Sequence, residues 1–315
     1  MNLQKLSLLQ KCPRVAIILL NYNGLKDTVE CLQSIKRNKY PNYELYLVDN
    51  CSNGEDVKIL KEQYTSFYDS LIEIKPKNLG FTGGNNFALR KLKNREDVDY
   101  FLLLSNDVIT DSRFLSELVK VAEGSPNIGI VGPKIYYYDF DGRKDIIQSA
   151  GAKINLWLGI FDGKGSQQED KGQLDKISEV DYVGGSCLLI KRATIKEIGL
   201  LDERYFLYFE ETDWCLRAKR AGYSILYVPR SQIWHKQGSS MRELPEIPTY
   251  YATRNLFWFE KKFANPFQLL LFFGYYFIIV FPWKISCFFL IKNRNKLILL
   301  RNYLIAVKNG FYYEE

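Results

Sequence analysis

Two residues of this 315-residue chain have the type and position of metal ligands. Asp107 ends the segment Ser105-Asn106-Asp107 after an apolar run, and a carboxylate there suits a hard divalent cation, which prefers oxygen ligands. His235 is the only histidine, and imidazole is a common metal ligand. Both residues also have plainer interpretations. Asp107 has the position of a cap for a helix that starts near Asp111, and a lone histidine is usually structural.

Three acids lie within four residues at a predicted helix start, namely Glu210, Glu211 and Asp213. Acids in a first helical turn complement the helix dipole, and Asp213 with Arg217 has the spacing of an ordinary ion pair. The cluster nevertheless has aromatic and apolar neighbours on both sides, which indicates a partly buried setting. A carboxylate in such a setting can have a raised pKa and act as a general base.

The elements that position these residues follow from short apolar runs that alternate with helical spacing. This rhythm predicts an α/β fold, with a parallel sheet covered by helices on both faces in the first half of the chain. The predicted strands are 14–20, 43–48, 71–74, 100–104 and 128–131, and the predicted helices are 25–36, 57–64, a helix from the end of the turn 78–86 through Leu92, and 114–122. The later segments are hairpins and loop over 136–178, a strand over 180–190 interrupted by Gly184-Gly185-Ser186, a helix over 211–221 and a strand over 224–228.

Polar residues follow several of the predicted strands. Ligands of open parallel sheets bind beyond the carboxyl ends of the strands, so these residues line one rim. Taken singly, Asn, Asp and Gly are ordinary turn and cap residues. The turn 78–86 lacks the G-x-G-x-x-G pattern and follows the third strand, which disfavours a dinucleotide site. Gly83 and Gly84 instead suit close approach to a phosphorylated ligand at a helix N-terminus.

Composition excludes several classes of function. The net charge is +7, but the basic residues are scattered and no basic-aromatic motif is present, so we expect no nucleic-acid partner. Six cysteines without a C-x-x-C pair, together with one histidine, exclude a zinc ribbon and fit a reducing compartment. Residues 1–11 lack the pattern of a signal peptide, so we expect a cytoplasmic enzyme body.

The last part of the chain differs from the rest. Residues 267–291 are almost entirely apolar, long enough to span a bilayer, and a basic segment follows them. We expect association with the cytoplasmic face of the cell membrane. Pro282 and Lys284 leave a re-entrant or interfacial pair of helices as open as a simple span, and helices that merely pack on the protein or on a dimer partner are the plainer alternative. The predicted domains are 1–260, which carries the site, and 261–315, a hydrophobic and basic helical tail.

In their order and spacing, these motifs resemble the family 2 inverting glycosyltransferases of the GT-A fold. The resemblance covers roughly residues 13–260 and is strongest to the bacterial rhamnosyltransferases of cell-surface polysaccharide synthesis. It implies a Rossmann-like, mostly parallel central sheet flanked by helices, with a C-terminal helical and hydrophobic extension. The motifs that carry it are Leu20-Asn21-Tyr22-Asn23-Gly24, Val48-Asp49-Asn50, Asn78-Leu79-Gly80-Phe81, Gly83-Gly84-Asn85-Asn86, Ser105-Asn106-Asp107, Gly184-Gly185-Ser186, Glu210-Glu211-Thr212-Asp213 and His235.

The resemblance also implies a role for each motif residue. Glu211 is the expected catalytic base, and Asp107 with His235 is expected to bind Mn²⁺ or Mg²⁺. The chain departs from the family at two positions, because Ser105 stands where some members carry a first acid and Glu211 where Asp is frequent. The expected donor-binding residues are Asn21, Asn23, Asp49, Asn78, Gly83, Gly84 and Asn106, and the expected acceptor-side residues are Gly185, Ser186, Glu210 and Asp213.

The predicted reaction moves a sugar from a nucleotide-diphosphate donor to a hydroxyl of a saccharide or lipid-linked saccharide acceptor. A nucleotidyltransferase acting on sugar phosphates and a non-catalytic nucleotide-sugar-binding module are the alternatives. An integral membrane polymerase is disfavoured, because one apolar segment is too few for a translocating channel. The sequence leaves the sugar, the base, the acceptor and the oligomeric state open, a homodimer included.

Overall fold

The computed structural model describes residues 12–74, 76–236, 246–290 and 296–312. Contacts group the chain into two compact units, which we call the sheet unit and the helical unit. The predicted division at residue 260 stays a prediction, and the units are described separately below. The sheet unit comprises Met1–Ala152, Gly163–Glu203 and Glu210–Gln237, and the helical unit comprises Lys153–Asp162, Arg204–Phe209 and Gly238–Glu315.

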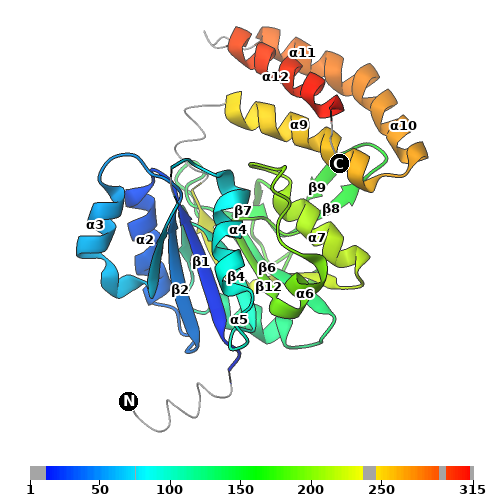
Figure 1. The fold of residues 1–315 in the computed structure, drawn as a ribbon. Coiled ribbons are helices and arrows are strands. Elements are labelled where there is room, and N and C mark those ends of the chain that lie inside the picture. Colours follow the sequence, from blue (N-terminus) through cyan, green and yellow to red (C-terminus); the bar gives the residue numbers. More distant parts are fainter. Residues whose placement is uncertain (1–11, 75, 237–245, 291–295, 313–315) are drawn as a thin grey trace. The chain divides into compact units, whose positions relative to one another are not determined.

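The first half of the sheet is parallel, as the sequence predicts. Its strands are β1 (Val15–Asn21), β2 (Tyr43–Asp49), β3 (Ser70–Glu73) and β4 (Tyr100–Ser105). β1 lies between β2 and β4, and all seven of its residues are buried. The register pairs Asn21 with Asp49 and Leu20 with Ser105. These three strands therefore end at one edge of the sheet (Figure 1).

The second half makes the sheet mixed. Its strands are β5 (Val108–Thr110), β6 (Ile128–Tyr137), β7 (Ile146–Ser149), β10 (Gln168–Glu169), β11 (Ser178–Glu179), β12 (Cys187–Lys191) and β13 (Ser224–His235). β12 lies between β4 and β6 and is antiparallel to both, whereas β13 runs parallel to β6. The end of β13 pairs His235 with Val108 of β5. This pairing brings the histidine next to the residue that follows Asp107.

Helices cover both faces of the sheet because the strand residues alternate between two cores. On β1, Ala16, Ile18 and Leu20 enter one core, and the residues between them enter the other. The first core is closed by α4, α6 and α7, and the second by α2, α3 and α5 (Figure 1). The helices are α2 (Leu25–Lys36), α3 (Asp56–Gln63), α4 (Gly80–Leu92), α5 (Phe114–Ala122), α6 (Arg192–Ile198) and α7 (Glu210–Arg220), with the short 3₁₀ turn η1 (Thr65–Phe67).

Three elements differ from the sequence prediction. The helix expected after the turn 78–86 begins at Gly80, so Gly83 and Gly84 lie within α4. The strand expected over 180–190 is limited to β12, which starts after the Gly-Gly-Ser segment. β6 and β13 both run further than predicted and pair with each other over most of their length. Each difference arises from long-range pairing or packing, which overrides local residue preference.

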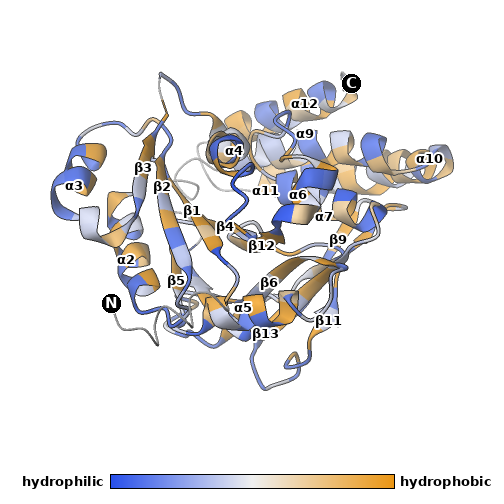
Figure 2. Cartoon of the chain, turned by 60° about the horizontal axis from the view of Figure 1, so that its bottom comes forward, coloured by the Kyte–Doolittle hydropathy of each residue, from blue (hydrophilic) through white to orange (hydrophobic). Residues whose placement is uncertain are grey.

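The described residues of the helical unit, with the chain ends next to them, form a short hairpin and several helical elements. They are β8 (Ala152–Asn155) and β9 (Ile160–Gly163), α9 (Glu246–Phe263), α10 (Pro266–Tyr275), the π-helical turn η2 (Tyr276–Val280), α11 (Phe281–Leu290) and α12 (Lys296–Phe311). α10 starts at a capping box in which Asn265 accepts from the backbone N–H of Gln268 and the Gln268 side chain accepts from Asn265. α10, η2 and α11 form one 25-residue helix, the one helix in the described parts of the chain with the length and composition to cross a membrane. Figure 2 shows the hydrophobic residues on these helices.

Candidate active site

A buried amide and a buried carboxylate fix the ends of β1 and β2. Asn21 Nδ2 donates to Asp49 Oδ2 at 2.8 Å, and both side chains are almost fully buried. Ser52 completes the cluster, because its Oγ donates to Asp49 Oδ2 at 2.6 Å and its backbone N–H donates to Asp49 Oδ1 at 3.0 Å. Thr28 Oγ1 donates to Asn21 Oδ1 at 2.8 Å. Asn21 is therefore bonded within the protein and fixes the orientation of Asp49.

Asn50 holds the turn that leads into α4. Its Nδ2 donates to Asn78 Oδ1 at 2.7 Å and to the Gly80 carbonyl at 2.9 Å, and its Oδ1 accepts from the Leu79 N–H at 3.0 Å. Asn78 Oδ1 also accepts from the Gly80 N–H at 2.7 Å. The Asn50 side chain is 2% exposed, and its hydrogen bonds are made to this turn. The predicted donor residue Asn78 is thus held rigidly at the rim.

Two of the three glycines of α4, Gly83 and Gly84, permit close packing inside the protein. A Cβ on Gly84 would lie 2.6 Å from Leu20 Cδ1, and a Cβ on Gly83 would lie 2.7 Å from Leu79 Cβ. A larger side chain at residue 84 would therefore push α4 away from the end of β1, and one at residue 83 would clash with Leu79 at the start of α4 itself. Gly83 and Gly84 bring the first turns of α4 against the rim, while a direct contact with a phosphorylated ligand stays a prediction.

The segments after β1 and β4 each carry one more of the predicted donor residues, Asn23 and Asn106. Asn106 Nδ2 donates to Thr28 Oγ1 at 3.0 Å and packs on Gly24, where a Cβ would meet that nitrogen at 2.4 Å. Asn23 is exposed, and its Oδ1 accepts from the Asn53 N–H at 2.6 Å. The backbone of Asn23 has a φ of 50°, in the left-handed region that Asn tolerates. Asn23 and Asn106 therefore both lie at the predicted rim, with Asn23 on its solvent side.

Asp107 and His235 meet, as the metal-site prediction requires. His235 Nε2 lies 3.2 Å from Asp107 Oδ2, although the two residues are far apart in sequence. Adjacent ligands of an octahedral ion with bonds near 2.1 Å lie about 3 Å apart, so the pair fits two neighbouring ligand positions of one ion. In the described residues, no three His, Cys, Asp or Glu side chains form a metal-binding group.

Gln148 on β7 fixes the histidine ring. Its Oε1 lies 2.9 Å from His235 Nδ1, and this contact is a hydrogen bond in the tautomer that carries its proton on Nδ1. In the neutral ring, Nε2 then presents its lone pair to the Asp107 side. Lys236 secures the same chain end, because its backbone N–H donates to the Asp107 carbonyl at 3.0 Å and its ammonium contacts Asp27 on α2 at 2.8 Å. The Asp107–His235 pair is therefore positioned from several elements.

Glu210 and Glu211 form a coupled acid pair at the start of α7. Burial first, and then the charge of Glu211, raise the pKa of Glu210 well above its ordinary value. Burial also raises the pKa of Glu211, but hydrogen bonds from Glu210 and from the Gly185 backbone act to lower that pKa. These directions favour the proton on Glu210 over Glu211, and a side-chain hydrogen bond joins the two carboxyl groups. The Oε2 atoms of Glu210 and of Glu211 each have no hydrogen-bond partner.

The Gly-Gly-Ser segment links the acid pair to the Asp107 side of the sheet. A Cβ on Gly185 would lie 3.6 Å from the Glu211 side chain, so the two are in contact. The Ser186 carbonyl accepts from the Ser105 N–H at 3.0 Å, two residues before Asp107. Asp107, His235 and Glu211 are thus brought to the same edge of the sheet unit by its own hydrogen bonds. The enzyme prediction depended on this convergence.

Asp213 has a different environment from the other acids. It is fully buried, and its Oδ1 accepts from Arg217 Nε at 2.6 Å. Arg217 NH2 in turn donates to the Leu200 carbonyl at 2.8 Å. This network anchors α7 to the chain that precedes it, so the geometry supports a positioning role. The predicted acceptor-side role of Asp213 is not tested by these contacts.

Three site residues were missing from the sequence-based assignment: Asn50, Ser52 and Gln148. Asn50 and Ser52 directly follow Asp49, so their place after a predicted strand was a usable signal. Gln148 lies in the glycine-rich segment 136–178, and no local pattern distinguishes it. Its position depends on the pairing of β7 with β6, where Ile147 lies opposite Tyr136.

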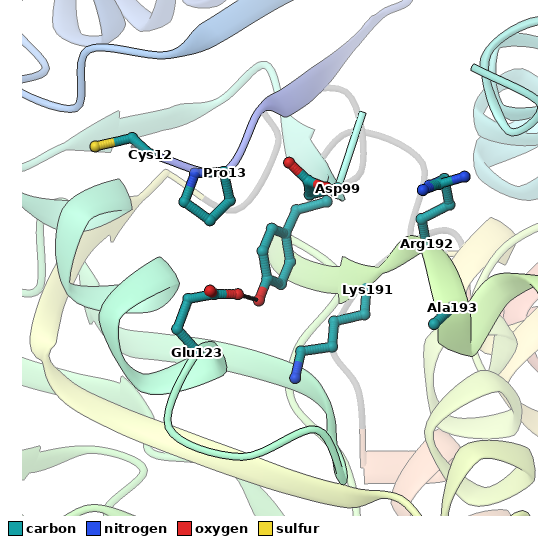
Figure 3. A pocket seen from close by; sticks show the side chains of 8 residues that line it. Cys12, Pro13, Asp99, Glu123, Lys191, Arg192 and Ala193 are labelled. Carbon is teal, nitrogen blue, oxygen red and sulfur yellow. Dashed lines mark hydrogen bonds between the residues drawn. The ribbon is translucent and has the colours of Figure 1, made fainter. Parts of the chain in front are cut away.

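A pocket of about 410 Å³ lies elsewhere in the sheet unit (Figure 3). It includes Tyr100, the first residue of β4, whereas Asp107 follows the last residue of that strand. The pocket therefore opens at the opposite edge of the sheet. Its charged groups are engaged locally, since Lys191 Nζ donates to the Ser125 carbonyl at 2.6 Å and Glu123 accepts from the Tyr100 hydroxyl. None of the predicted site residues lines it.

A wound sheet that gathers polar strand ends, an Asp–His pair and a buried carboxylate at one edge has the arrangement of a nucleotide-sugar-dependent transferase. Comparison with known families agrees with this class. Residues 16–199 match the sequence profile described as "Glycosyl transferase family 2". The chain belongs to glycosyl transferase family 2.

Curated relatives include proteins from archaea and bacteria. The chain is 26% identical over 211 residues to the low-salt glycan biosynthesis hexosyltransferase Agl10 of Haloferax volcanii, which covers 67% of this chain and 63% of that protein. It is 39% identical over 150 residues to the N-acetylglucosaminyl-diphospho-decaprenol L-rhamnosyltransferase of Mycobacterium tuberculosis, covering 45% of this chain and 48% of that protein. The chain thus matches less than two thirds of the length of either relative.

Solved structures agree with the fold. The mannosyltransferase PcManGT from Pyrobaculum calidifontis, in complex with GDP-Man and Mn²⁺, superposes with a TM-score of 0.59 over 96% of this chain and 85% of that chain. The sequence identity is 15%, so this likeness concerns the fold alone. It confirms the predicted GT-A architecture, in which the sheet is mixed beyond β4.

Proposed function

We propose that this protein is a metal-dependent, inverting glycosyltransferase that uses a nucleotide-diphosphate sugar. The observation that carries the proposal is the contact of Asp107 with His235 at the edge of the sheet where Gly185 holds Glu211. Membership of family 2 and the hexosyl- and rhamnosyltransferase names of its relatives support the same reaction class. The rim of Asn23, Asp49 and Asn78 lies where a nucleotide would bind in a wound sheet.

Asp107 and His235 would hold a divalent cation, Mn²⁺ or Mg²⁺. The carboxylate and the imidazole are donors that both ions accept, and their 3.2 Å separation suits neighbouring positions on one ion. Fold neighbours were crystallised with Mn²⁺, which supports a divalent metal in general. When bound, the ion would supply positive charge for the diphosphate that leaves. Gln148 would keep Nε2 of His235 available by accepting from Nδ1.

Glu211 would act as the general base. Its carboxylate takes the proton of the acceptor hydroxyl while that oxygen forms a bond to the anomeric carbon. The bond from this carbon to the diphosphate oxygen breaks, and the nucleoside diphosphate leaves with the electron pair. Attack from the face opposite the leaving group inverts the configuration. Glu210 would hold the neighbouring proton and keep Glu211 ionised, and Gly185 and Ser186 would line the acceptor side.

The acceptor would be a saccharide or a lipid-linked saccharide of cell-surface polysaccharide synthesis. The mycobacterial relative is named for a decaprenol-linked substrate, and the apolar helix Pro266–Leu290 suits work at a membrane. We therefore propose an enzyme body in the cytoplasm, associated with the cytoplasmic face of the cell membrane. A second copy of the chain is a further candidate partner.

The released nucleotide tests the proposal. Purified protein is incubated with a panel of nucleotide-diphosphate sugars, Mn²⁺ and an extract of membrane lipids, and released nucleotides are separated by ion-exchange chromatography. The account predicts nucleoside diphosphate, formed only with Mn²⁺ or Mg²⁺ present. Pyrophosphate from a sugar phosphate and a nucleoside triphosphate would instead identify a nucleotidyltransferase. Tight donor binding without turnover in any arm would identify a binding module.

A further inference from the structure

The helical unit has a large apolar surface that its own core leaves uncovered. Its buried aromatic residues meet around Phe257 and Phe272, whereas the opposite sides of α10, α11 and α12 are exposed. The apolar side chains that are more than half exposed are Phe267, Leu270, Ile278, Ile279, Trp283, Phe289 and Leu290 on the long helix, and Leu297 and Ile298 on α12. An apolar surface of this extent marks an interaction site.

The same part of the chain is strongly basic. Residues 261–315 hold eight lysines and arginines and two acids, Glu314 and Glu315 at the very end, and the rest of the chain has 35 basic and 34 acidic side chains. Most of the positive net charge therefore resides here. The preceding acid, Glu260, is fully buried in the helical unit, and burial raises its pKa to about 8. An apolar and uniformly basic surface is complementary to an anionic phospholipid leaflet rather than to a protein of mixed charge.

α12 turns back along the long helix. The hydroxyls of Tyr303 and Tyr276 are 2.9 Å apart, and the Tyr303 ring stacks on Phe281 at 5.8 Å. Further along α12, the Phe311 ring stacks on Phe273 at 5.5 Å. Later residues of α12 thus contact earlier residues of the long helix. The two run antiparallel as a helical hairpin (Figure 1).

α12 is also fastened to α9. Trp258 Nε1 donates to the Asn309 carbonyl at 3.3 Å, and Asn309 Nδ2 donates to the Tyr250 hydroxyl at 2.9 Å. Gly310 lies so close to Phe257 that an added Cβ would be 2.8 Å from its Cβ. α9, α12 and the long helix therefore form one packed bundle. If one of these helices enters a membrane, the helices packed against it lie at a similar depth.

This packing is incompatible with a simple membrane span. At about 1.5 Å per residue, the long helix measures roughly 37 Å and exceeds a hydrocarbon core of about 30 Å. α12 measures only about 24 Å by the same rule and exposes Arg301 and Lys308. α9 adds Lys261 and Lys262 to the same bundle. If the long helix crossed the bilayer, these charged groups would enter the hydrocarbon region.

We infer that the hairpin made by the long helix (Pro266–Leu290) and α12 (Lys296–Phe311) enters one leaflet of an anionic phospholipid membrane and does not cross it. This inference rests on the membrane association within the proposed function and specifies its partner and topology. The exposed apolar side chains insert below the headgroups. The basic side chains bind the headgroup phosphates, and Trp283 and Lys284 lie next to each other as residues typical of an interface.

Vesicle binding tests the partner. The full chain is sedimented with vesicles of phosphatidylcholine alone or with about one third phosphatidylglycerol. We expect at least tenfold stronger binding to the anionic vesicles, and we expect 0.5 M salt to abolish that difference.

The variant Ile279→Glu should weaken vesicle binding by about tenfold or more. Ile177→Glu in the sheet unit is the matched control, because both isoleucines are 54% exposed. The triple variant Lys296→Gln, Arg301→Gln, Lys308→Gln should lose the preference for anionic lipid. Two results would overturn the inference and leave the proposed reaction standing. One is equal vesicle binding by the wild type and all variants. The other is a wild-type protein that does not bind vesicles but still binds nucleoside diphosphate.

Labelling tests the topology. Lys296→Cys is introduced into a chain in which Cys12, Cys51 and Cys287 are replaced by alanine, and the protein is bound to preformed anionic vesicles. A membrane-impermeant maleimide is added outside the intact vesicles, and in a second sample after detergent has dissolved them. We expect the cysteine to be labelled to the same extent in both samples. Protection until the vesicles are dissolved would mean that α12 begins on the far side, and the helix would then be a span.

Discussion

The rim around Asn21 and the reacting groups around Glu211 and Asp107 use buried polar side chains in opposite ways. At the rim, Asn21, Asp49 and Asn50 are at most 2% exposed and make several hydrogen bonds to one another and to nearby turns. At the reacting groups, Glu210 and Glu211 each keep an oxygen without a partner, and Asp107 faces His235 across 3.2 Å. The side chains of the first region are bonded to one another, whereas we propose that the acids of the second region bind a ligand. Variants should therefore separate stability from chemistry.

The largest effect we expect among the metal residues is from Asp107→Asn. Losing the carboxylate removes the charged ligand, so transfer should fall on the order of 10²–10³-fold and Mn²⁺ should bind more weakly. Mn²⁺ titration followed by electron paramagnetic resonance measures the affinity directly. Asp111→Asn, four residues on, is the control and should leave it unchanged. Equal Mn²⁺ affinity in wild type and Asp107→Asn would remove Asp107 from the metal site.

A smaller effect is expected from Gln148→Leu. The leucine keeps most of the volume but cannot accept from His235 Nδ1, so the ring loses its fixed orientation and Mn²⁺ affinity should drop about 10–100-fold. Gln148→Glu retains an acceptor and should preserve the affinity. The exposed Gln168→Leu on β10 controls for the added apolar side chain. A structural role alone would lower the Tm of Gln148→Leu without changing metal binding.

The smallest effect on chemistry should come from Asn50→Ala, which tests the rim. The variant loses three hydrogen bonds to the Asn78–Gly80 turn, and the groups that Asn50 paired with are left without that partner. The free energy of unfolding should therefore fall by about 1–3 kcal/mol. Donor KM should rise while kcat changes little. Urea denaturation measures the stability, with the exposed Asn53→Ala as control. A large fall in kcat at unchanged stability would contradict the division between rim and reacting groups.

Much of the parallel half was predictable from local pattern. β1, β2 and β4 are short apolar runs, and residues that end such runs had to meet at one edge once the strands were parallel. α4 was harder, because Gly83 and Gly84 have poor helix propensity and resembled a turn. The contact with Leu20, which requires glycine, outweighs that preference. Such a contact is invisible without the packing.

The remainder depends on long-range pairing. β12 inserts between β4 and β6, and the residue pattern of 187–191 does not predict this position. The insertion places Gly185 at the carboxyl end of β4, beside Glu211. Gln148 has no signal in sequence, since its role follows from the register of β7 on β6. His235 and Asp107 were each ambiguous alone; their meeting through β13 and β5 supplies the contact that the metal-binding prediction requires, and the Mn²⁺ titration of Asp107→Asn tests that prediction. The hairpin of α12 on the long helix was likewise left open by its hydropathy.

The central claim is that Glu211 is the carboxylate that accepts the proton. Single-turnover transfer and donor binding are measured for wild type, Glu211→Gln and Glu210→Gln between pH 5 and 8. Because a base must be ionised and burial raises the pKa of Glu211 above its ordinary 4.5, wild-type transfer should fall as the pH drops through that raised pKa. Glu211→Gln should lose about 10²–10⁴-fold with donor binding intact, whereas Glu210→Gln, which mimics the protonated acid, should stay within a few-fold of wild type. Wild-type transfer by Glu211→Gln would contradict the account.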